Sequence, residues 1–197
     1  MTEFKSLRVA HEYTQTHPAP PEKVFPLLCP VREAEWVPDW HYRLVYSDSG
    51  VAELGCTFTT PNTSTASRQS SAAEILPDAE TTWITVDYDP AALRIAYVWI
   101  NPGRVATELR IQLEPTSDGG ARSHIHFRYT GLSHEGNREV ESYDRKWFEQ
   151  KMHGWESAIN HYLRTGRKID SGAWGVKAYL CGADILVRGL WFSSTQP

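Results

Sequence analysis

Apolar and polar residues alternate along residues 6–16, and this period of two is typical of a half-buried β-strand. The same period returns in six later segments, which are separated by turn sequences such as Asn101-Pro102-Gly103. We predict these six strands over residues 42–47, 52–60, 82–88, 93–100, 105–114 and 122–131. The pattern therefore indicates a seven-stranded antiparallel sheet.

Two short helices are predicted between the first and the second strand. Proline at the start of a helix is favourable, because the first N–H groups have no partner within the helix, and Pro21 followed by Glu22 fits such a start. Pro26 and Pro30 limit this helix to about two turns, because proline breaks a helix interior. A second short helix is expected over residues 31–36.

A long amphipathic helix is predicted after the last strand. From Val140 to Leu163 the apolar residues recur at steps of three and four, which indicates one α-helix of roughly seven or eight turns, ended by Gly166. Its broad apolar face needs a sheet to pack against. We therefore expect an α+β fold in which the antiparallel sheet wraps around a long C-terminal helix.

Composition narrows the classes of partner. Lys and Arg number 20 against 24 Asp and Glu, a net charge of −4, so neither nucleic acid nor an anionic membrane surface is an expected partner. Aromatic residues are abundant, with 8 Trp, 9 Tyr and 6 Phe. Because such large rings are costly to expose, we expect them to line an interior surface. The absence of a long apolar run or an apolar N-terminal stretch predicts a cytoplasmic protein without stable membrane insertion.

The potential metal ligands form no recognisable site. The spacing of Cys29, Cys56 and Cys181 matches neither a zinc site nor a redox pair, so we expect reduced thiols. His124 and His126 could chelate a metal by their spacing, but strand parity places both on the outer face. We predict no metal site and no cofactor.

Four segments carry a resemblance to a known family. They are Pro21-Glu-Lys-Val-Phe-Pro-Leu-Leu, Glu35-Trp-Val-Pro-Asp-Trp40, Trp83-Ile-Thr-Val-Asp-Tyr-Asp and the stretch from Tyr143 through Trp155 to Gly166. With the order of elements, they resemble the START-like superfamily, also called SRPBCC or helix-grip, which includes the birch-pollen-allergen fold and polyketide cyclases. The resemblance implies one helix-grip domain over residues 1–166, followed by a C-terminal extension over 167–197.

The resemblance also implies a hydrophobic cavity between the sheet and the long helix, although a filled core remains the alternative. Parity places Leu54, Cys56 and Phe58 on one inner face, and leaves open which face of the fourth strand points inward. Trp36 and Trp40 are interpreted either as a gate at the cavity mouth or as plugs. The candidate ligand-binding residues are Tyr13, Trp36, Trp40, Phe58, Trp99, Thr107, Phe127, Trp147 and Trp155.

Two functions follow from such a cavity. The first is binding or carrying a small hydrophobic ligand, either a lipid or a polyketide-like molecule. The alternative is a cofactor-free polyketide cyclase or dehydratase, in which His11 is the general base and Tyr97 or Tyr129 polarises an oxygen atom. A structural role for His11 is the competing interpretation.

The C-terminal extension has an unusual composition. Gly175, Gly182 and Gly189 interrupt an apolar helical pattern, and such a helix needs packing to persist. We expect the extension either to form a homo-oligomer, or to dock on its own domain, or to be a disordered end. The Ser- and Thr-rich loop at residues 61–71 is a potential lid.

Overall fold

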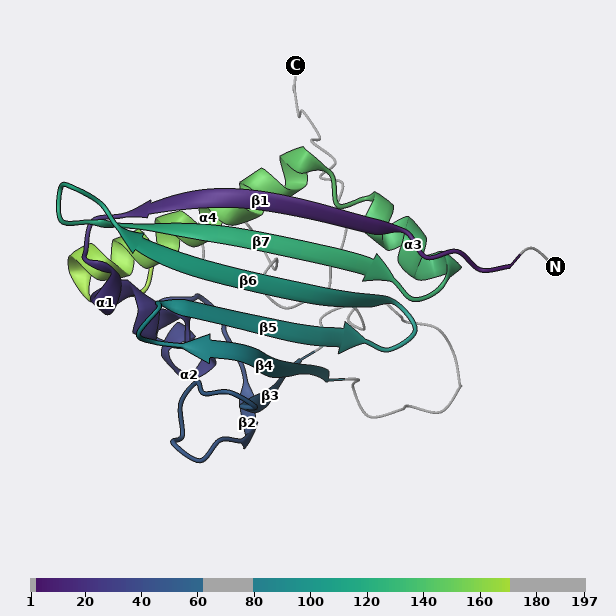
Figure 1. The fold of residues 1–197 in the computed structure, drawn as a ribbon, viewed down its shortest axis with the longest axis horizontal. Helices are drawn as coiled ribbons and strands as arrows, with labels where there is room; N and C mark the ends of the chain where they lie inside the picture. The colour runs from purple at the N-terminus through teal and green to yellow at the C-terminus, as the bar shows by residue number, and fades with distance from the viewer. Residues whose placement is uncertain (1–2, 62–79, 171–197) are drawn as a thin grey trace, which may run out of the picture.

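The computed structural model describes residues 3–61 and 80–170 (Figure 1). The predictions for the loop from residue 62 onward and for the extension from residue 171 onward lie outside the described residues, self-association through the extension included. Within the described residues no helix is long and apolar enough to span a bilayer.

In the described residues, seven strands form one antiparallel sheet in the order β1-β7-β6-β5-β4-β3-β2. The strands are β1 (Arg8–His17), β2 (Arg43–Tyr46), β3 (Thr57–Thr60), β4 (Thr81–Asp89), β5 (Arg94–Asn101), β6 (Val105–Pro115) and β7 (Ala121–Gly131). Because β1 pairs with β7, the first strand of the chain lies at one edge of the sheet, next to the last strand, and β2 lies at the other edge. The predicted sheet is confirmed.

Helices cover one face and one end of the sheet. They are α1 (Pro21–Val24), the 3₁₀ helix η1 (Phe25–Leu28), α2 (Pro30–Glu33), α3 (His134–Glu141) and α4 (Arg145–Thr165). Figure 1 shows α4 running behind β1 and β7, with α1 and α2 at the end of the sheet where β1 finishes. The predicted helix-grip α+β fold is therefore confirmed, with the short helices between β1 and β2.

The single long helix that we expected from Val140 onward is wrong at its N-terminal end. The chain leaves α3 at Ser142 and starts α4 afresh, because the Asp144 side chain accepts a hydrogen bond from the backbone N–H of Trp147 at 2.7 Å. This is an N-cap, which satisfies a donor at the start of a helix. The expected C-terminal end is correct, since Gly166 follows α4 with a left-handed φ of 67°.

The strand predicted over residues 52–60 is also wrong in its first half. Gly55 has a φ of +81°, and its N–H donates to the carbonyl oxygen of Thr85, so the chain turns before β3 begins. As a result Leu54 is 67% exposed instead of facing inward, whereas Cys56 and Phe58 are buried as expected.

The pairing of β4 with β5 settles which face of β4 points inward. Trp83 lies directly opposite Trp99, and both side chains are buried. Ile84 and Val86 point outward and are 44% and 45% exposed. A register shift after Thr85 changes the alternation further along the strand.

Candidate functional site

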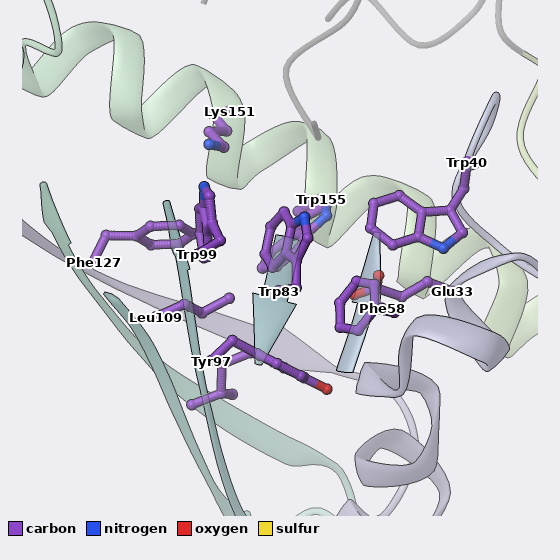
Figure 2. A pocket seen from close by; sticks show the side chains of 11 residues that line it. Glu33, Trp40, Phe58, Trp83, Tyr97, Trp99, Leu109, Phe127, Lys151 and Trp155 are labelled. Atoms are coloured by element: carbon purple, nitrogen blue, oxygen red, sulfur yellow. The ribbon is translucent and has the colours of Figure 1, made fainter. Parts of the chain in front are cut away.

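An aromatic pocket lies between the inner face of the sheet and α4 (Figure 2). It is lined by Glu33, Trp40, Phe58, Trp83, Tyr97, Trp99, Leu109, Ile111, Phe127, Lys151 and Trp155. Most of the wall is therefore apolar, and of the described residues that line it only Glu33 and Lys151 have an acidic or basic side chain. The enclosed space has a volume of about 20 Å³, which is room for one water molecule.

The register of the sheet lines up the flat side chains of the wall. Phe58, Trp83 and Trp99 occupy paired positions on β3, β4 and β5. Phe58 stacks on Trp83 with ring centroids 5.5 Å apart, and Trp83 stacks on Trp99 at 3.8 Å. Phe127 meets Trp99 edge to face at 6.0 Å. The wall thus offers both ring faces and ring edges, as aromatic clusters generally do.

Hydrogen bonds anchor several of these rings. The indole N–H of Trp40 donates to the carbonyl oxygen of Pro30 at 2.8 Å, and that of Trp83 donates to the Thr60 hydroxyl at 2.9 Å. The Tyr97 hydroxyl donates to the carbonyl oxygen of Leu28 at 2.8 Å. These contacts fix one end of the wall to the short helices and to β3.

Trp155 differs from the anchored rings. Its indole Nε1 is buried, and no acceptor for it lies among residues 3–61 and 80–170. A buried donor without an acceptor costs about 1–3 kcal/mol. The ring of Trp155 is therefore held by packing alone, chiefly against Trp36 at 6.2 Å and Phe127 at 6.4 Å between centroids.

Glu33 places a carboxyl group in the pocket at the end of α2. Its side chain is 8% exposed, and no hydrogen bond or ion pair in the described part of the chain reaches the carboxyl. Burial disfavours the charged form and raises the pKa of Glu33 to about 8. The group is consequently a neutral acid at neutral pH.

Lys151 brings the second ionisable group from α4. Its Nζ atom lies 5.0 Å from the ring centroid of Phe127 and 5.1 Å from that of Trp147, which are cation–π distances. In Figure 2, Lys151 comes from α4 on one side of the pocket, and Glu33 enters beside Phe58 on the other. The basic group and the acidic group therefore lie on opposite sides of the pocket.

The structure gathers part of the predicted set around this pocket. The predicted residues that line it are Trp40, Phe58, Tyr97, Trp99, Phe127 and Trp155. Their positions follow from strand parity and from the apolar face of α4. Ligand contact by these residues stays a prediction.

The other predicted ligand-binding residues lie outside the pocket lining. Trp36 is buried between the short helices and α4, where its indole N–H donates to the carbonyl oxygen of Leu27 at 2.8 Å. Thr107 is buried on β6, and Trp147 stacks on Tyr143 at 4.7 Å. The remaining one, Tyr13, contacts Glu156 through its hydroxyl at 3.5 Å.

The three predicted catalytic residues do not meet in one site. The Nε2–H of His11 donates to the carbonyl oxygen of Tyr143 at 2.7 Å, and its ring stacks on Phe148 at 4.8 Å. Tyr129 is buried, with its ring on Phe127, whereas Tyr97 lines the pocket with its hydroxyl already donated. This geometry favours an anchoring role for His11 between β1 and the start of α4.

Sequence reasoning missed Glu33 and Lys151. Lys151 could have been found, because it lies four residues after Trp147 and four before Trp155, on the same helical face. Glu33 carries no comparable signal, because its burial depends on how the short helices close the end of the sheet. The sequence left open whether Trp83 points inward, and its pairing with Trp99 in the sheet answers this.

No protein-family model matches this chain, and no curated protein matches it in sequence. Among solved structures, Ara h 8.0201 has a TM-score of 0.52 at 18% identity, covering 80% of this chain and 99% of that one. Mll3558 from Rhizobium loti has a TM-score of 0.53 at 16% identity, covering 80% and 99%.

An enzyme is also among these structural neighbours. Norcoclaurine synthase from Thalictrum flavum, in complex with dopamine and hydroxybenzaldehyde, has a TM-score of 0.54 at 13% identity. The match covers 81% of this chain and 88% of that one. With the observed topology, these likenesses show that the chain has the helix-grip fold.

Proposed function

We propose that this helix-grip protein binds a small hydrophobic molecule in the aromatic pocket between the sheet and α4. The observation that carries the proposal is the continuous wall of rings formed by Phe58, Trp83 and Trp99, which faces Trp155 across the pocket. Flat indole faces favour a planar, polyketide-like ring system over a lipid acyl chain, because stacked rings gain contact along their whole face.

Ligand binding requires the pocket to widen, because its volume of about 20 Å³ accommodates no more than a water molecule. Trp40 and Trp83 are held by hydrogen bonds, whereas Trp155 is held by packing. We therefore assign the movable wall to Trp155, whose displacement opens the space between α4 and the sheet. Such a pocket is a minor conformation that the ligand stabilises.

A cofactor-free cyclase or dehydratase is the second candidate function, and Glu33 is the observation that favours it. A neutral carboxylic acid in an apolar pocket is a proton donor suited to carbonyl chemistry near neutral pH. In this version Glu33 takes the acid role, since His11 lies outside the pocket lining.

Thermal unfolding of the protein with a panel of planar aromatic and acyl-chain compounds tests the binding proposal. A ligand at a hundred times its Kd should stabilise the fold by about 2.7 kcal/mol and raise the Tm by a few degrees. In Trp99→Leu this rise should be lost, whereas Ile100→Ala, the next residue on β5 with an outward side chain, should keep it. An unchanged Tm with every compound would reject the proposal.

Turnover separates the two candidate functions. If the protein is a dehydratase, mass spectrometry of an added β-hydroxyketone should show loss of one water molecule in the wild type and not in Glu33→Gln. A binding protein returns the compound unchanged.

A further inference from the structure

Three polar groups of the pocket lining can donate a hydrogen bond to a ligand. Trp155 has a buried indole N–H without an acceptor in the described residues, and Lys151 has an ammonium group. The carboxyl of Glu33 lies in an apolar environment and has no partner among residues 3–61 and 80–170, so the neutral O–H form is favoured over the anion. The Tyr97 hydroxyl is already donated to Leu28.

Two of these donors are neighbours on one helix face. Lys151 and Trp155 are four residues apart on α4, so their side chains lie one turn apart above the ring wall. Each is 8% exposed, so water reaches them poorly. An oxygen acceptor placed between them by a ligand would satisfy the indole N–H and gain the attraction of the ammonium group.

We propose that the ligand is a planar aromatic molecule with a carbonyl or anionic oxygen, which accepts hydrogen bonds from Trp155 Nε1 and Lys151 Nζ. This inference rests on the proposed function and names the ligand class. Glu33 supports it from the opposite side of the pocket, because a neutral carboxyl does not repel an anion and offers a further donor.

The same arrangement selects against amines. A ligand ammonium group would lie in a pocket that already contains Lys151, and the repulsion of like charges is strong where water is excluded. Glu33 could offset that repulsion only as a carboxylate, which burial disfavours. The pocket therefore distinguishes ligands by the sign of their polar group as well as by their ring.

Four naphthalenes with different groups at the same ring position test the inference: naphthoate, acetylnaphthalene, ethylnaphthalene and naphthylmethylamine. Their affinities are measured at neutral pH by calorimetry. We expect naphthoate and acetylnaphthalene to bind about tenfold more tightly than ethylnaphthalene, and the amine to bind most weakly. Equal affinities, or tightest binding of the amine, would overturn the inference and leave the proposed function standing.

Substitutions of Trp155 and Lys151 test whether each of these residues donates to the ligand oxygen. Trp155→Phe keeps a ring but removes the N–H, so the affinity for acetylnaphthalene should fall about fivefold while that for ethylnaphthalene stays within twofold. Lys151→Met should remove the advantage of naphthoate, and the control Lys146→Met, at an exposed position of α4, should keep it. If none of the four compounds binds the wild type, the inference is rejected, and the proposed function falls with it only when no compound of the thermal-unfolding panel binds either.

Discussion

Trp83 and Trp99 lie directly opposite each other on β4 and β5, and their rings stack with centroids 3.8 Å apart and planes 25° from parallel. This pair forms the centre of the ring wall and therefore connects sheet register with the shape of the pocket. A slip of β4 by one residue against β5 would turn Trp83 outward and bring Ile84 inward.

The stability of the fold should depend strongly on this pair. Trp83→Ala removes a buried indole that contacts four other rings, so the free energy of unfolding should fall by about 3–5 kcal/mol. The adjacent change Ile84→Ala, at an outward position, should alter it by only about 0.5 kcal/mol. Urea unfolding measures both, and equal losses would contradict the assigned faces of β4.

Glu33 should make the stability of the fold depend on pH in a range that is unusually high for a carboxyl group. Its pKa is about 8 in the folded chain against 4.5 ordinarily, so the folded state keeps a proton that the unfolded state has lost. The free energy of unfolding should fall as pH rises from about 4.5 to 8, by up to about 5 kcal/mol. Urea unfolding should show that Glu33→Gln removes this fall, while the exposed control Glu22→Gln keeps it. The same fall in both variants would contradict the burial of Glu33.

His17 should produce the opposite dependence in mildly acidic solution. Its Nδ1–H donates to Asn160 Oδ1 and its Nε2 accepts from the Ser123 hydroxyl, both at 2.8 Å, so the neutral ring ties β1 and β7 to α4. Burial is the main cause that lowers the pKa of His17 below its ordinary 6.5. Since the unfolded state then binds more protons, the free energy of unfolding should fall as pH drops below about 6.5.

The variant His17→Gln tests this assignment. It should lose about 1–3 kcal/mol of stability above pH 6.5, because Asn160 and Ser123 lose well-placed partners, and should show less pH dependence below that value. His124→Gln, at an exposed position of β7, is the matched control. Chemical unfolding across this pH range measures both variants, and a slope in His17→Gln that equals the wild-type slope would refute the role of His17.

Gly136 should resist replacement by alanine although it lies in a helix. A Cβ atom there would overlap the carbonyl oxygen of Arg104, because α3 packs closely against the turn before β6. Alanine gains about 1 kcal/mol in helix propensity, but a clash with backbone costs about 1–3 kcal/mol or more, so Gly136→Ala should be destabilising. Thermal unfolding should show a lower Tm than for Glu141→Ala at the end of the same helix, and a higher one would contradict the close packing.

Periodicity alone was enough to predict the long central strands. Along β6, Val105, Leu109 and Leu113 are all buried, as alternation predicts, and β7 behaves alike. Where a strand is short and interrupted, alternation failed: Leu54 follows the apolar pattern, but the turn at Gly55 exposes it. A local hydrogen-bonded turn can therefore override a pattern of this length.

The candidate site was less predictable than the fold. Its rings could be proposed, because the inward positions of Phe58, Trp99 and Phe127 follow from parity. Its ionisable groups could not, since a charged residue on a helix is ordinarily exposed and the burial of Glu33 depends on tertiary contacts. The alternation of the first strand placed His11 on the inward face and hence in the cavity, but tertiary packing sets its ring against Phe148, outside the pocket lining.

The indole N–H signals of the protein, which has 8 tryptophans, offer the most direct test of ligand binding in the aromatic pocket. Heteronuclear NMR of the ¹⁵N-labelled protein is recorded during titration with acetylnaphthalene, and signals are assigned by single Trp→Phe variants. The account predicts that the Trp155 signal moves most, because its N–H gains an acceptor, and that the Trp83 signal moves with it. Binding that leaves both signals in place would contradict the account.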